Sequence, residues 1–154
     1  MILKLPENHQ AFACLVDKGT HPSCRNLQET YPVKDHRLFR ALQKNLSHLA
    51  HWAPICGESG VLPLIAFPFV KLFVHNQLLA FEVVASVVVN HLQHFFEFFP
   101  NPPVNVLAAC ENLLCFHAPS LLEHFAANGV TAVLYAWPLL ETLFSEILTS
   151  DVSA

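Results

Sequence analysis

The sequence predicts an all-α fold, an irregular array of helices, on the basis of three observations. Leucines recur at helical spacing, most clearly at Leu38, Leu42, Leu46 and Leu49. Proline and glycine separate the apolar segments, and no hairpin dipeptide joins two segments of alternating polarity. The 154 residues are 53% hydrophobic and only 13% charged, so the chain is long enough and apolar enough to bury a core.

The first third of the chain predicts two helices joined by a polar loop. Residues 8–16 read as a short helix, which ends at the glycine and proline of residues 19–22. Residues 20–33 are polar and bounded by prolines, so we expect a loop with at most one turn of helix. A longer helix then begins after Asp35, a good N-cap residue, and closes after Trp52, where a proline follows.

The middle of the chain predicts a connector and two apolar helices. Residues 57–60 form the connector, and residues 62–73 form a helix with one proline in its first turn and a second as a kink. Asn76 is a good N-cap for a long helix that reaches Phe99. The valine-rich run at 83–89 is compatible with a strand. Its length and the absence of flanking turn residues favour a helix buried on several faces.

Prolines also organise the last third of the chain. Residues 100–103 contain three prolines, which end one helix and start the next. Gly129 stands where a C-cap glycine is expected. We expect helices at about 104–116, about 119–128 and about 138–148.

Charge and cysteine content restrict the class of protein. Residues 1–71 contain all eight Lys and Arg and carry a net charge of +3, whereas residues 72–154 carry −7. The basic half is too weakly charged for a nucleic-acid partner. We interpret the uneven distribution of charge as two faces that are solvated differently, in preference to a polarised docking surface. Five cysteines without framework spacing, and no secretory signal, indicate a cytoplasmic protein whose reduced cysteines fill the core.

The mean hydropathy of +0.40 is high for a free-standing domain, so a membrane or a neighbouring element should cover some of the surface. The two most apolar segments, 61–74 and 78–89, are short and interrupted by prolines and charges. No integral membrane span is therefore expected. A membrane-associated hairpin at 62–99 stays open as the least favoured alternative.

No constellation of residues predicts a catalytic, metal or cofactor site. His48 and His51, and likewise His91 and His94, are three residues apart and should share a helix face, but neither pair extends into a zinc motif. The four glycines form no phosphate-binding loop. The phenylalanines are expected mainly in the core, and the run Phe95-Phe96-Glu97-Phe98-Phe99 is the best candidate for an exposed docking face.

Several segments together resemble the TBC domain, the helical fold of Rab GTPase-activating proteins. The opening Gly19-x-x-Pro22-x-x-Arg25 is similar to the start of that family. Towards the other end the order of short motifs is more specific. It runs His124-Phe125, Gly129-Val130, Leu134-Tyr135-Ala136 and Leu143-Phe144-Ser145.

Further segments, at residues 50–52, 64–73 and 98–103, resemble the WD40-repeat-containing type of TBC protein, which is associated with centriolar satellites and the ciliary base. The resemblance covers about residues 7–149. It implies that residues 1–154 are a single partial TBC domain, a fragment or short form without the upstream WD40 propeller and the last TBC helices.

The resemblance implies a mechanism whose residues are missing from this chain. Active TBC domains insert an arginine from an Asp-x-x-Arg motif and a glutamine from a Tyr-x-Gln motif, which stabilise charge on the phosphoryl group and position the attacking water. Neither motif occurs among the 154 residues. One alignment places Glu29 at the arginine position and Cys56-Gly57-Glu58 at the glutamine position, and a carboxylate there would repel a triphosphate.

We therefore expect a catalytically degenerate TBC-like domain that is not an enzyme. It would serve as a protein-interaction scaffold at the centrosome and ciliary base, with centrosomal or ciliary proteins as partners. The alternative is an active GTPase-activating protein for a Rab, with Arg25, Arg37 or Arg40 as an unorthodox finger.

Overall fold

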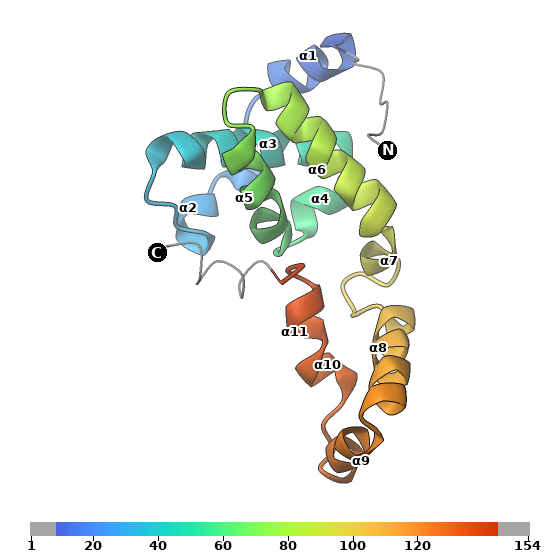
Figure 1. Ribbon diagram of the computed structural model, residues 1–154. Coiled ribbons are helices and arrows are strands. Elements are labelled where there is room, and N and C mark those ends of the chain that lie inside the picture. The colour runs from blue at the N-terminus through green and yellow to red at the C-terminus, as the bar shows by residue number, and fades with distance from the viewer. Residues whose placement is uncertain (1–8, 145–154) are drawn as a thin grey trace. The chain divides into compact units, whose positions relative to one another are not determined.

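The computed structural model describes residues 9–144, and these residues form helices and connecting turns without a strand (Figure 1). The predicted all-α fold is confirmed. The chain divides into two compact units, residues 1–91 and 92–154. The single domain expected over 1–154 stays a prediction.

Helix α3 (His36–Trp52) is the central element of the first unit. It packs against α1 (His9–Asp17), the 3-10 helix η1 (Pro22–Cys24) and three later helices, which are α4 (Ile55–Glu58), α5 (Leu62–Leu72) and α6 (Gln77–His91). A short helix, α2 (Leu27–Thr30), lies between η1 and α3. The predicted leucine stripe explains the central position of α3, because Leu42, Leu46 and Leu49 are all buried.

Local side-chain caps set the starts of the two longest helices of this unit. Oδ1 of Asp35 accepts hydrogen bonds from the backbone N–H groups of Arg37 and Leu38, at 2.8 and 3.2 Å. Oδ1 of Asn76 likewise accepts from the N–H of Leu79, at 3.0 Å. Both predicted N-caps are therefore confirmed, because each satisfies a donor that the first turn of a helix leaves free.

Two predictions in the middle of the chain were wrong in extent. The connector expected at 57–60 overlaps α4, which adds a helical turn over Ile55–Glu58.

The helix expected to reach Phe99 ends at His91, and a separate turn, α7 (Gln93–Phe96), follows. Leu92, with φ −110° and ψ 0°, leaves the helical conformation and is buried, although no proline or glycine stands there to interrupt the helical pattern. The valine-rich run is helical, as predicted.

The second unit continues from α7 into α8 (Val104–His117), α9 (Pro119–Ala127), α10 (Ala132–Tyr135) and α11 (Trp137–Leu140). Its small core is formed by Leu107, Ala132 and Ala136. Gly129, at φ +69°, closes α9, with its N–H bonded to Ala126 and that of Val130 bonded to Phe125. The expected glycine C-cap is thus confirmed.

The helix expected at about 138–148 was wrong within the part that the structure describes. α10 was not predicted, and α11, which corresponds to the predicted helix, begins at Trp137 and already ends at Leu140. Leu143 and Phe144 have φ values of 50° and 59°, which a right-handed helix excludes. Residues 145–148 of that prediction lie outside the described residues.

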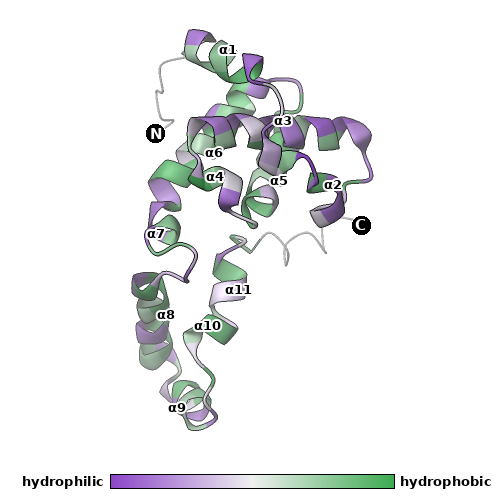
Figure 2. Ribbon diagram, turned by 180° about the vertical axis from the view of Figure 1, so that it is seen from behind, coloured by the Kyte–Doolittle hydropathy of each residue, from purple (hydrophilic) through white to green (hydrophobic). Residues whose placement is uncertain are grey.

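Hydropathy differs between the helices of the first unit, as Figure 2 shows: α3 carries much hydrophilic surface, whereas α5 is apolar along most of its length. Between residues 9 and 144, no helix has both the length and the apolar character needed to cross a bilayer. Large apolar side chains nonetheless stand exposed in both units, including Leu72 at 74% and Phe116 at 82% exposure.

Candidate functional site

The residues that we expect at the TBC finger positions, Glu29 and residues 56–58, lie in short helices of the first unit. Glu29 lies in the first turn of α2, and Glu58 is the last residue of α4. Both side chains are exposed, so each presents a carboxylate to solvent. Cys56 is buried, and burial raises the pKa of its thiol to about 11. The thiol is therefore protonated at neutral pH and has the character of a core residue rather than a nucleophile.

Close packing fixes the short helix α4 against η1 and α3. A Cβ on Gly57 would lie 3.2 Å from Cε1 of His21 and from Oγ of Ser23, and 3.3 Å from Cβ of Ala50. His21 and Ser23 are themselves joined by a hydrogen bond of 2.7 Å between Nδ1 and Oγ. Helix α4 is therefore packed closely against η1 and α3.

Glutamines close to these helices already have structural partners. The amide of Gln43 donates to the carbonyl of Cys24 at 2.9 Å, which links α3 to η1. The amide of Gln28 donates to the carbonyl of Val33 at 3.5 Å. Each of these contacts uses one of the two N–H donors of the amide and ties the side chain to the surrounding backbone.

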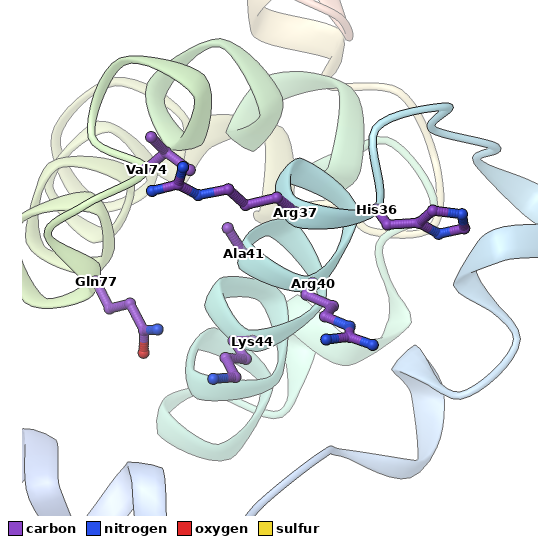
Figure 3. Close-up of a pocket in the computed structure, with 7 residues that line it drawn as sticks. All are labelled: His36, Arg37, Arg40, Ala41, Lys44, Val74 and Gln77. Atoms are coloured by element: carbon purple, nitrogen blue, oxygen red, sulfur yellow. The ribbon is translucent and has the colours of Figure 1, made fainter.

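A second candidate site is a basic groove of about 640 Å³ between α3 and the α5–α6 connection (Figure 3). We define the basic groove by its lining residues, which are His36, Arg37, Arg40, Ala41, Lys44, Val74 and Gln77. The three permanent cations come from successive turns of α3, because they are spaced three and four residues apart. Nη2 of Arg37 donates to Nδ1 of His75 at 2.8 Å.

The structure separates the three arginines that were considered as alternative fingers. Arg37 and Arg40 line the basic groove, whereas Arg25 follows η1 and is not among the lining residues. The grouping of Arg37 and Arg40 with Lys44 was missed at the sequence level. The signal was present, because residues 37, 40 and 44 share one face of a predicted helix.

Histidines and cysteines form no further site in the structure. Residues 9–144 contain no group of three side chains able to hold a metal ion. The expectation that His91 and His94 share a helix face was wrong, because α6 ends at His91 and α7 begins at Gln93. The expectation that all cysteines fill the core was wrong for Cys14 and Cys115, which are exposed, and holds for Cys24 and Cys56.

The aromatic run at residues 95–99 is divided between contact and exposure. Phe95 packs edge to face on Trp137, with ring centroids 5.3 Å apart. Phe98 and Phe99 are exposed, at 41% and 37%. The run is therefore partly packed and partly exposed, and a docking role for its exposed side chains stays a prediction.

Comparison with known proteins identifies relatives over nearly the whole chain. Over 150 residues, or 97% of the chain, it is 57% identical to TBC1 domain family member 31 of Homo sapiens and 59% identical to that of Xenopus tropicalis. The chain is homologous to part of TBC1 domain family member 31. The resemblance to TBC proteins is confirmed. No family model and no solved structure gives a significant match.

The relatives are much longer than the region of similarity. The chain spans 14% of the length of the human and frog proteins, and 15% of the mouse protein, to which it is 57% identical. Homology therefore establishes a relationship to TBC-domain proteins. The activity, location and partners of the whole protein are matters for proposal.

Proposed function

We propose that this chain is a TBC-like module that binds other proteins and does not itself accelerate GTP hydrolysis. The observation that carries the proposal is the absence of both finger motifs from its 154 residues, although the chain is homologous to part of a TBC protein. The two fingers supply most of the catalytic effect of such an activator, since an arginine finger alone is worth about a thousandfold or more in rate.

The chemistry at the aligned positions supports this proposal. In the alignment that puts Glu29 at the arginine position and residues 56–58 at the glutamine position, the carboxylates of Glu29 and Glu58 are exposed. A carboxylate adds negative charge near the developing charge of the phosphoryl group, and so opposes the stabilisation that an arginine would supply. The nearby amides of Gln28 and Gln43 each donate to a backbone carbonyl.

A binding role without catalysis agrees with the packing of this region. Gly57 joins α4 closely to η1 and α3, and the buried leucines of α3 form a core beneath them. The chain therefore keeps a framework on which a partner can dock after the catalytic residues have been replaced. From the resemblance alone, we propose centrosomal or ciliary scaffold proteins as partners and the centrosome and ciliary base as the location.

A second candidate function is activation of a Rab by an unorthodox arginine. It is favoured by one observation: Arg37 and Arg40 line the same groove, and within the described residues neither forms an ion pair with a carboxylate. We rank it below the binding function, because neither arginine belongs to an Asp-x-x-Arg motif, and Gln77, the glutamine that lines the same groove, belongs to no Tyr-x-Gln motif.

Single-turnover GTP hydrolysis on a panel of Rab proteins tests the proposal. The 154-residue chain is added in excess, its helical content is first checked by circular dichroism, and an active TBC protein serves as the positive control. We expect hydrolysis rates equal to the intrinsic rates. Acceleration of any one Rab by the chain would refute the proposal.

A further inference from the structure

We propose that the basic groove along α3 binds an acidic peptide segment of a partner protein. This inference rests on the proposed binding function and names the surface and the chemistry of the partner. The groove holds about 640 Å³ and is lined by Arg37, Arg40 and Lys44, together with one apolar and one amide side chain from the opposite wall, Val74 and Gln77 (Figure 3).

Within the part of the chain that the structure describes, no carboxylate neutralises the positive charge in the groove. Among residues 9–144, none of the three cations pairs with a carboxylate. The nearest acid in sequence, Asp35, accepts backbone hydrogen bonds from Arg37 and Leu38 as the cap of α3. Uncompensated cations on one wall of a groove attract an anionic partner and accelerate its encounter.

The imidazole of His75 orients one of these cations. Nη2 of Arg37 donates to Nδ1 of His75 at 2.8 Å, which uses one of the five N–H donors of the guanidinium. The remaining donors stay available for a carboxylate. A guanidinium positioned in this way loses less side-chain freedom when it binds a ligand.

The spacing of the cations favours a peptide over a single phosphate group. Arg37 and Lys44 are seven residues apart on one helix, which separates their positions by about 10 Å along the axis. A phosphate is bound best by donors that converge on one point. Carboxylates on alternate residues of an extended peptide are about 7 Å apart, so two or three of them can meet cations distributed along the groove.

The opposite wall of the groove also suits a peptide. The side-chain amide of Gln77 offers both a donor and an acceptor, as a peptide backbone requires. Ala41 and Val74 supply apolar contact for the stems of side chains. These features favour an acidic peptide over an anionic membrane surface, which is attracted by charge alone and needs no such wall.

Fluorescence polarisation on the full 154-residue chain tests this proposal. The probe is a short fluorescent peptide with glutamate at alternate positions, and its comparison peptide has glutamine in place of each glutamate. We expect binding of the glutamate peptide only. The affinity should fall as salt is raised, because the Debye length shortens from about 10 Å at 0.1 M to about 3 Å at 1 M.

Charge-reversal variants locate the binding. Arg40→Glu and Lys44→Glu should each lower the affinity for the glutamate peptide by about threefold to tenfold, and the double variant should lower it by about tenfold or more. Lys18→Glu is the matched control, because it makes the same charge change at an exposed residue outside the groove. Circular dichroism confirms that each variant is folded.

Three results would overturn the proposal. The first is that the chain binds the glutamate and glutamine peptides equally well, and the second is that Lys18→Glu weakens peptide binding as much as the groove variants do. The third is that the chain binds phosphatidylserine vesicles through the groove but does not bind the peptide. The last result would assign the groove to a membrane surface. The peptide-binding assay tests the groove, and the GTP hydrolysis assay tests the proposed function. A chain that binds no peptide can still leave Rab hydrolysis at its intrinsic rate, so the two failures are distinguishable.

Discussion

His48 lies on the buried side of α3, where its ring packs edge to face on Phe12 with centroids 4.9 Å apart. Its Nδ1 atom has no hydrogen-bond partner in the described structure. Burial, and then the charges of His51 and Lys44, lower its pKa from 6.5 to about 4. A protonated imidazole is disfavoured in such a site, because both desolvation and neighbouring positive charge act against it.

This lowered pKa predicts how stability depends on pH. Between pH 6.5 and about 4 the unfolded chain binds a proton at His48 and the folded chain does not, so the free energy of unfolding rises with pH. The contribution is complete above pH 6.5 and is lost as pH falls towards 4. We expect a loss of about 2 kcal/mol between about pH 7.5 and pH 5, measured by urea unfolding.

The variant His48→Leu should remove most of this pH dependence, because it removes the titrating group and the unpaired ring nitrogen. His117→Gln, at an exposed histidine, is the control and should leave the dependence unchanged. Equal pH dependence in His48→Leu and the unmodified chain would show that another group is responsible.

Gly57 provides a second prediction for a single residue. In Gly57→Ala the new Cβ would approach His21, Ser23 and Ala50 at 3.2–3.3 Å. The first two side chains are hydrogen-bonded to each other, and Ala50 is fixed on α3, so none can yield easily. We expect the free energy of unfolding to fall by about 1–2 kcal/mol, measured by urea unfolding.

Gly60→Ala is the matched control for that substitution. Nothing lies within 4 Å of a Cβ at Gly60, and its φ is not in the positive range. Stability should therefore change by less than about 0.5 kcal/mol. Equal effects of the two substitutions would contradict the close packing described for α4.

At the level of elements, the start of α3 depends on one carboxylate. Replacing Asp35 with alanine removes the acceptor for the N–H groups of Arg37 and Leu38. The free energy of unfolding should fall by about 1 kcal/mol, measured by chemical denaturation. Asp35→Asn keeps an acceptor and should retain most of that stability; a large loss in both variants would contradict a capping role.

Helix starts were predictable from sequence because their causes are local. Asp35 and Asn76 each satisfy backbone donors two or three residues away. The end of α9 was predictable for the same reason, because Gly129 adopts the positive φ that a closing turn requires. Helix ends were less predictable. The break at Leu92 and the positive φ of Leu143 and Phe144 have no proline or glycine at those positions to signal them.

The candidate site was predictable only in part, for a related reason. The absence of the two finger motifs is a property of the sequence and needs no structure. The basic groove depends on Val74 and Gln77, which are more than thirty residues away from Arg40 in sequence and come beside α3 through the packing of α5 and α6. The periodicity of α3 indicates that its cations share a face, but not what stands opposite them.

At the level of the whole molecule, charge is divided along the chain. All eight Lys and Arg lie within residues 1–71, and the basic groove gathers three of them. Residues 92–144 contain no Lys or Arg and present large exposed apolar side chains such as Leu113 and Phe116. The positive charge of the chain thus lies in its first half, whereas neither an Asp-x-x-Arg nor a Tyr-x-Gln motif occurs in the sequence.

The most direct measurement compares the rate of Rab GTP hydrolysis with the unmodified chain and with the triple variant Arg25→Ala/Arg37→Ala/Arg40→Ala. We predict that both rates equal the intrinsic rate on every Rab tested, because no arginine of this chain serves as a finger. A tenfold or larger acceleration by the unmodified chain, lost in the triple variant, would correspond to about 1.4 kcal/mol or more of transition-state stabilisation. That result would contradict a purely binding role.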